Sequence, residues 1–169
     1  MCKGPRHEPA RKTGVKPLRA SLRQLLLGVI FIGNAGLMVE LALLRHAESV
    51  SQWVPHVALF VGLVSLIAVY FRPTPATLKA FRVVMWVFLV VGAVGVFFHL
   101  RGNVEFALER DPSLSGSRLI WKALRGATPA LAPGALAQLA LLGLLYTYRH
   151  PALAGRNVTE RESFDNTLV

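Results

Sequence analysis

The sequence predicts an all-α integral membrane protein, a four-transmembrane-helix bundle with a short amphipathic helical segment in its second outer loop. Apolar residues make up 53% of the 169 residues and charged residues only 17%, whereas about a quarter of the residues of a soluble domain are charged. Four apolar stretches approach the roughly 20 residues that a helix needs to cross a bilayer core. Basic residues flank these stretches, as is usual in membrane proteins.

The four expected spans are Leu25–Leu44, Trp53–Phe71, Val83–Leu100 and Ala130–Tyr148. Each must be helical, because lipid offers no hydrogen-bond partner to an unpaired backbone group. The first span is too long for a secretory signal and lacks a small-x-small cleavage site after it, so we expect a retained anchor. The membrane domain then covers residues 24–148, between a basic, disordered tail of residues 1–23 and a second tail of residues 149–169.

The distribution of positive charge predicts the orientation. The two tails and the loop between the second and third spans hold thirteen of the nineteen Lys and Arg residues, and the two other loops hold six. The positive-inside rule therefore places both termini in the cytoplasm of a multi-pass membrane protein. The preference for Arg over Lys fits a GC-rich bacterial genome, and the expected location is the bacterial inner membrane. The net charge of +10 is assigned to lipid head groups, and no nucleic-acid partner is expected.

Several local signals predict where helices begin and end. Thr74 before Pro75 is typical of an N-cap and a first helical turn. Residues 103–110 should extend the third helix beyond the membrane until Asp111-Pro112 stops it. A second short helix should follow from about Ser117 to Gly126.

The short helix separates its side chains into two faces, which suits a helix lying on a membrane surface. Docking on a partner protein is the alternative. The cationic face comprises Arg118, Lys122 and Arg125. The apolar face comprises Ile120, Trp121 and Leu124.

Four glycines within the spans are interpreted as points of close helix packing rather than as a phosphate-binding loop. They are Gly62, Gly92, Gly95 and Gly143.

Two polar residues interrupt the first span, Asn34 and Glu40. A carboxylate at the centre of a spanning helix costs roughly 2.5–3.5 kcal/mol, and less near the interface. Gly33 and Gly36 share a helix face with Glu40, and small residues let neighbouring helices approach. We therefore expect Glu40 to point into the bundle.

Three histidines lie near the outer ends of the spans: His46, His56 and His99. Together with Glu40 they are candidate ligands of a transition metal or a haem, since neutral imidazole is a common ligand. They could equally form a proton-relay cluster. The alternative is interfacial histidines with wet polar tips, because no pair of them is fixed by helical spacing. Asn34, Asn103 and Glu105 are further candidates for such a polar site.

No catalytic motif is present, and the single cysteine, Cys2, excludes an intrachain disulfide. The first functional hypothesis is a non-catalytic accessory or binding subunit that packs against a larger membrane complex or forms a homo-oligomer. The second is a metal- or haem-handling membrane protein. The third is a proton- or solute-coupled transporter centred on Glu40. The lipid bilayer is the one partner common to all three.

Overall fold

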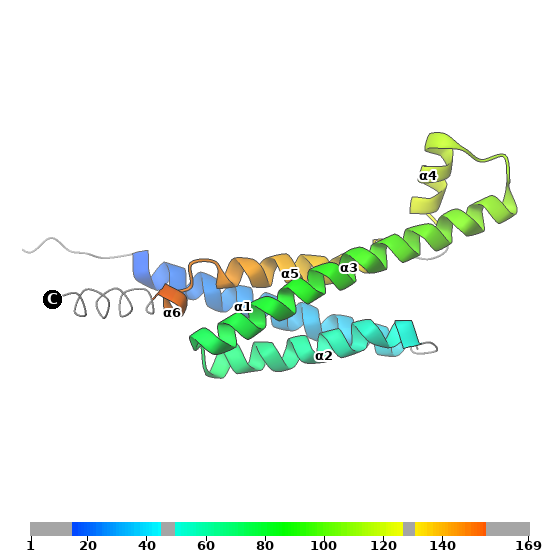
Figure 1. Cartoon of the computed structure of the whole chain (residues 1–169). Coiled ribbons are helices and arrows are strands. Elements are labelled where there is room, and N and C mark those ends of the chain that lie inside the picture. The colour runs from blue at the N-terminus through cyan, green and yellow to red at the C-terminus, as the bar shows by residue number, and fades with distance from the viewer. Residues whose placement is uncertain (1–14, 45–49, 127–130, 155–169) are drawn as a thin grey trace, which may run out of the picture.

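The computed structural model describes residues 15–44, 50–126 and 131–154, and every regular element within these ranges is a helix (Figure 1). The helices are α1 Val15–Leu43, α2 Val50–Phe71, α3 Pro75–Arg110, α4 Gly116–Leu124, α5 Gly134–Thr147 and α6 Pro151–Ala154. Three of them, α1, α2 and α3, are long and apolar enough to cross a membrane.

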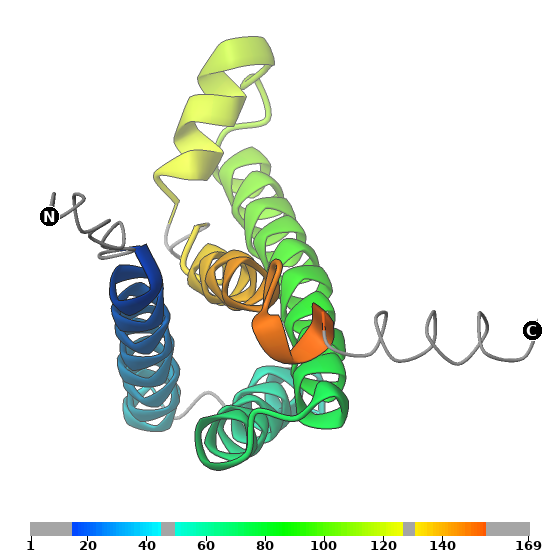
Figure 2. The same cartoon turned by 90° about the vertical axis from the view of Figure 1, so that its left-hand side faces the viewer.

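Helices α1, α2, α3 and α5 form an antiparallel bundle (Figures 1 and 2). Helix α2 packs on α1 and α3, and α5 packs on α3 and α1, so each of the four helices has two neighbours. The most extensive contact joins α3 to α5. The start of α1 and the end of α5 consequently lie at the same end of the bundle.

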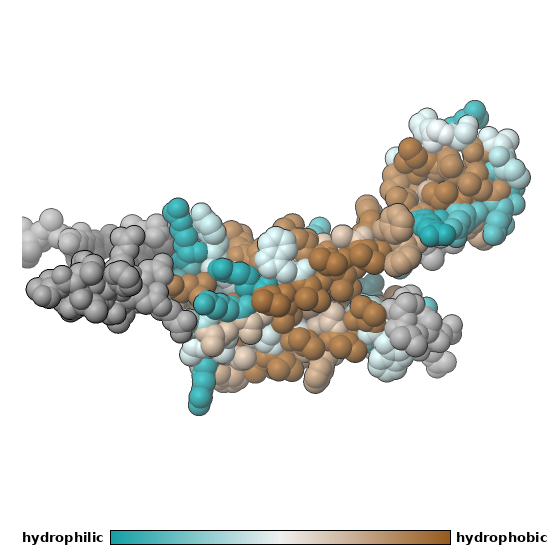
Figure 3. All heavy atoms as spheres, viewed as in Figure 1, coloured by the Kyte–Doolittle hydropathy of each residue, from teal (hydrophilic) through white to brown (hydrophobic). Residues whose placement is uncertain are grey.

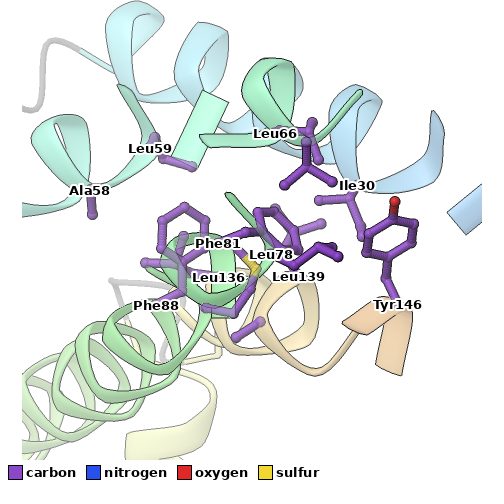
Figure 4. Packing of buried hydrophobic residues seen from close by; sticks show 13 residues of the cluster. Ile30, Ala58, Leu59, Leu66, Leu78, Phe81, Phe88, Leu136, Leu139 and Tyr146 are labelled. Carbon is purple, nitrogen blue, oxygen red and sulfur yellow. The ribbon is translucent and has the colours of Figure 1, made fainter. Parts of the chain in front are cut away.

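All four helices contribute to the apolar core (Figure 4). Phe81 and Phe88 of α3 are fully buried between Leu59 of α2 and Leu139 of α5. The outward faces of α1, α2 and α3 carry many exposed large apolar side chains, and Figure 3 shows this hydrophobic surface along the bundle. A surface of this kind is stable in lipid rather than in water, so the three long helices indicate a multi-pass membrane protein.

Helix α3 begins and ends where the sequence predicts. Thr74 is its N-cap, and the Thr74 hydroxyl accepts a hydrogen bond from the backbone N–H of Thr77, with Pro75 in the first turn. The helix continues through Gly102 and ends at Arg110, with Asp111 as C-cap. The expected extension over residues 103–110 is therefore confirmed.

The four glycines are points of close helix packing, as expected. A Cβ added at Gly62 would lie 2.2 Å from Phe88, and one at Gly143 would lie 2.2 Å from Sδ of Met85. A Cβ at Gly92 would lie 2.8 Å from the backbone nitrogen of Ala137, and one at Gly95 would lie 2.7 Å from Pro133. The small residues of α3 thus let the first turn of α5 approach closely.

The fourth expected span, Ala130–Tyr148, is shorter than predicted. Its helix α5 has 14 residues, which at 1.5 Å per residue is about 21 Å. The helix starts late because Pro133, which has no backbone N–H to donate, occupies the N-cap position. The residues before it form a tight turn, in which the Gly134 N–H donates to the Leu131 carbonyl at 2.8 Å. Ala130 lies outside the described residues.

The chain is also helical in parts of both expected tails. Helix α1 begins at Val15, so residues 15–23 are not a disordered tail. Pro17 is compatible with this start, because the first backbone N–H groups of a helix have no partner within it. At the other end, α6 forms over Pro151–Ala154.

The expected short helix after α3 is present as α4, which begins at Gly116 instead of about Ser117 and ends at Leu124 instead of Gly126. Its N-cap is Ser115, and Gly116 adopts a positive φ of 57° that glycine tolerates. In Figure 1, α4 turns away from the bundle axis beside the projecting end of α3.

Candidate functional site

The side chain of Glu40 is exposed on α1, and the expectation that it points into the bundle is wrong. The buried positions of α1 are Ile30 and Asn34, and Glu40 lies on the flank of the helix next to that stripe. Gly33 on the same flank packs against Leu139 of α5. Because the two helices are antiparallel, Glu40 is level with residues that precede Gly134, where α5 has not yet begun. The late start of α5 therefore leaves the flank uncovered.

The residues around Glu40 form what we term the α1 flank: Ile32, Gly36, Val39, Glu40 and Leu43. All five are exposed. A Cβ added at Gly36 would meet nothing within 4 Å. The α1 flank thus combines three exposed apolar side chains and one glycine with one carboxyl group, in a helix that could span a membrane.

Asn34, a further site candidate, lies in the core and not with Glu40. Its side chain is 1% exposed, and its Oδ1 is buried without a hydrogen-bond partner. A Cβ added at Gly62 of α2 would lie 2.8 Å from the Asn34 amide nitrogen. The missing side chain of Gly62 thus provides the space in which the amide packs.

The histidines do not gather around Glu40 in the described part of the chain. His56 is partly buried, its Nδ1 lies 3.0 Å from the Gln52 carbonyl oxygen of its own helix, and its ring centroid is 5.5 Å from that of Trp53. His99 is partly buried on α3. Within residues 15–44, 50–126 and 131–154, no three His, Cys, Asp or Glu side chains are grouped as metal ligands. His46 lies outside these ranges, so the metal or haem site stays a prediction.

The two remaining candidates have partners of their own. The Glu105 carboxylate accepts from Arg101 Nε at 2.8 Å in an exposed pair one helical turn apart. Asn103 is 3% exposed, and its Nδ2 donates to the carbonyl oxygen of Ala123 in α4 at 2.9 Å. Asn103 therefore joins α4 to α3.

The sequence interpretation missed a polar network at the opposite end of the bundle. Arg82 donates to the Thr147 hydroxyl at 3.3 Å and to the Thr147 carbonyl at 3.1 Å, and Arg23 donates to the Arg149 carbonyl at 3.0 Å. Arg82 thus binds the carbonyl of the last residue of α5, which has no partner within the helix. Arg23 binds a carbonyl in the turn that follows α5. Arg23 and Arg82 could be recognised in the sequence as basic residues in the first part of α1 and α3, but they were used only to predict the orientation of the chain in the membrane.

His150 completes this network. It is 8% exposed, and its Nδ1 accepts from the backbone N–H of Ala152 at 3.3 Å. Burial and, to a lesser extent, the nearby charge of Arg23 lower the pKa of His150. The neutral imidazole is thus favoured in the folded protein, and it is the form whose Nδ1 can accept from Ala152.

Comparisons with protein-family models, with curated proteins and with solved structures found no match to this chain. The fold and the candidate site are those of an all-helical multi-pass membrane protein with a carboxyl group on the outside of its bundle.

Proposed function

We propose that this chain is a non-catalytic membrane subunit whose α1 flank packs against a helix of a larger membrane complex. The observation that carries the proposal is the exposure of Glu40 within an apolar, candidate spanning helix. The polar network at the other end of the bundle joins helices of this chain to one another, whereas the α1 flank faces outward.

The energetic argument starts from the cost of an uncovered carboxyl group. Glu40 is three residues before the end of α1, which places it about 5 Å along the helix from that end. A carboxylate in lipid at this depth is unfavourable, although less so than at the bilayer centre. A partner helix that supplies a hydrogen-bond donor or a cation would offset this cost.

The shape of the α1 flank supports the same partner. Association of helices in lipid depends on close packing, and glycine lets two backbones approach. Among the described residues, no atom lies within 4 Å of a Cβ added at Gly36, and Glu40 lies one turn further along the same helix. The partner is therefore a membrane helix with an apolar face and one donor side chain, such as Arg, Lys or Asn, level with Glu40.

Site-specific photocrosslinking in native membranes tests the proposal. A photoreactive residue at Gly36 or Val39 should give one discrete adduct, and the same residue at Val64, which is exposed on α2, should not. Glu40→Leu should weaken the adduct from Gly36. If both α1 positions react only with lipid, as Val64 does, the proposal is wrong.

The mass of the adduct separates a larger complex from self-association. An adduct of twice the 18.5 kDa chain mass would show that a second copy covers the α1 flank. An adduct of any other mass supports the larger complex.

A further inference from the structure

Helix α4 presents an exposed apolar face and three cations at the projecting end of α3. Ile120, Trp121 and Leu124 are 60%, 61% and 41% exposed. Ala123, by contrast, is fully buried against α3. The cations are Arg118, Lys122 and Arg125, all exposed, and the helix contains no acidic residue.

The position of α4 along α3 is fixed by Asn103. Its amide donates to the Ala123 carbonyl in the last turn of α4, and a Cβ added at Gly126 would lie 2.3 Å from the Asn103 Cγ. Asn103 is three residues beyond Leu100, where the apolar run of α3 ends, so it lies about 5 Å past that end. In Figure 1, α4 runs across the bundle axis at this level rather than along it.

From this placement we infer that α4 lies in the head-group layer of the bilayer and binds anionic phospholipid. A helix perpendicular to the bundle axis is parallel to the membrane plane, so its apolar face can enter the acyl-chain boundary while its cations meet phosphates. The Arg125 guanidinium lies 5.7 Å from the Trp121 ring centroid, which places a cation beside an aromatic side chain of the kind that prefers the interface.

Asp111 feels the charges of two of these cations, but among the described residues it forms no ion pair with them. Asp111 accepts from the Ser113 hydroxyl at 2.6 Å and from its backbone N–H at 3.1 Å. These two hydrogen bonds, more than the charges of Lys122 and Arg118, lower the pKa of Asp111. Asp111 is thus engaged in the turn before α4, and three positive charges remain on a helix that the fold holds at the level of lipid head groups.

The inference is tested on the purified full-length protein in lipid nanodiscs, with Trp121 as the only tryptophan. Trp53 and Trp86 are about half exposed, so both can be replaced by Phe with little loss of packing. Phospholipids brominated near the glycerol end of the acyl chain should quench Trp121, and aqueous acrylamide, a neutral quencher that an anionic surface does not repel, should quench it little. Nanodiscs of equal parts phosphatidylcholine and phosphatidylglycerol should protect Trp121 from acrylamide more than phosphatidylcholine alone.

The cations are tested by the combined variant Arg118→Gln, Lys122→Gln and Arg125→Gln. It should lose the additional protection that phosphatidylglycerol provides, with a loss of roughly fivefold in apparent lipid affinity per cation removed, since each contributes about 1 kcal/mol near an anionic surface. The matched control is Arg110→Gln, an exposed cation on α3 whose guanidinium lies over Phe106. It should leave the protection unchanged.

Two outcomes would overturn the inference. If acrylamide quenches Trp121 in both lipids and bromines do not, the apolar face of α4 does not enter the bilayer and is open to a protein partner. If the triple variant retains the full effect of phosphatidylglycerol, its cations do not bind the head groups. Neither outcome bears on the α1 flank, because no other protein is present in this experiment.

Discussion

Asn103 and His150 show how single buried polar residues hold the ends of the bundle together. Each is more than nine-tenths buried and bonds to the backbone of another segment or turn. Sequence reasoning identified Asn103 as a polar candidate, but its partner, Ala123, is 20 residues away and has no polar side chain. Every residue has a backbone carbonyl, so the sequence does not indicate which one accepts this hydrogen bond. The contact could therefore not have been predicted.

Asn103→Leu should release α4 while leaving the bundle folded. The substitution removes the hydrogen bond that joins α3 to α4, which typically contributes about 0.5–1.5 kcal/mol. The Ala123 oxygen keeps its hydrogen bond from the backbone N–H of Gly126. Hydrogen exchange of the backbone amides of residues 116–126 should become faster, and exchange within α2 should not change. The control is Glu105→Gln, two residues away and exposed. Unchanged exchange in α4 would contradict the role given to Asn103.

His150 should make the end of the bundle sensitive to acid. Because burial and Arg23 lower its pKa in the folded protein, the unfolded chain binds a proton more readily than the folded one. The stability that neutral His150 contributes is complete above the unfolded pKa of about 6.5. It is lost as the pH falls from there through the lower folded pKa, where Nδ1 can no longer accept from Ala152.

The measurement is thermal stability in detergent between pH 8 and pH 5. The wild-type protein should lose stability over this range, and His150→Gln should lose less, because Gln does not titrate. Equal pH dependence in both proteins would assign the effect to other groups.

At the scale of the helices, α3 is central because its small residues admit α5. Gly92, Gly95 and Gly143 were identified from the sequence as close-packing positions, and the structure confirms all three. The sequence could not distinguish them from Gly28 and Gly36 of α1, around which a Cβ would meet nothing. Glycine marks where close approach is possible, and only the neighbouring helix decides where it occurs.

Gly92→Ala should destabilise the bundle, and Gly28→Ala should not. The new Cβ at Gly92 would lie 2.8 Å from a backbone nitrogen of α5, so the helices must separate, at a typical cost of about 1–3 kcal/mol. Gly28→Ala meets open space and gains up to about 1 kcal/mol of helix propensity. Unfolding in detergent, followed by tryptophan fluorescence, measures both. Equal stability of the two variants would contradict the packing described here.

At the scale of the whole molecule, the described ends of the chain lie together. Helix α1 starts, and α5 and α6 end, at one end of the bundle (Figure 1), where Arg23 donates to the Arg149 carbonyl. Seven described basic residues lie towards this end: Lys16, Arg19, Arg23, Arg72, Lys79, Arg82 and Arg149. Five others lie towards the opposite end: Arg101, Arg110, Arg118, Lys122 and Arg125. This excess of Lys and Arg at the end that holds the described termini supports the expectation that both termini are cytoplasmic.

Thiol labelling in spheroplasts tests this topology. Cys2 is the single cysteine, and a membrane-impermeant reagent should label it only after lysis. In a Cys2→Ser background, a cysteine at Ser163 should behave in the same way, and one at Ser115, an exposed position before α4, should react in intact spheroplasts. Labelling of the Ser163 position without lysis, with Cys2 still protected, would show that α5 does not complete a crossing. Labelling of both positions in intact spheroplasts would show the opposite orientation.

From the sequence alone we could predict the class of protein, the three long apolar helices, the cap at Thr74 and the end of α3 at Arg110, because these depend on local composition and on backbone hydrogen bonds within one segment. The packing of the helices fixes which glycines pack closely, where α5 begins, which backbone groups Asn103 and Arg82 bind, and that Glu40 faces outward. These features depend on the offset between neighbouring helices. A shift of one helix by a single turn would change them all without altering any residue.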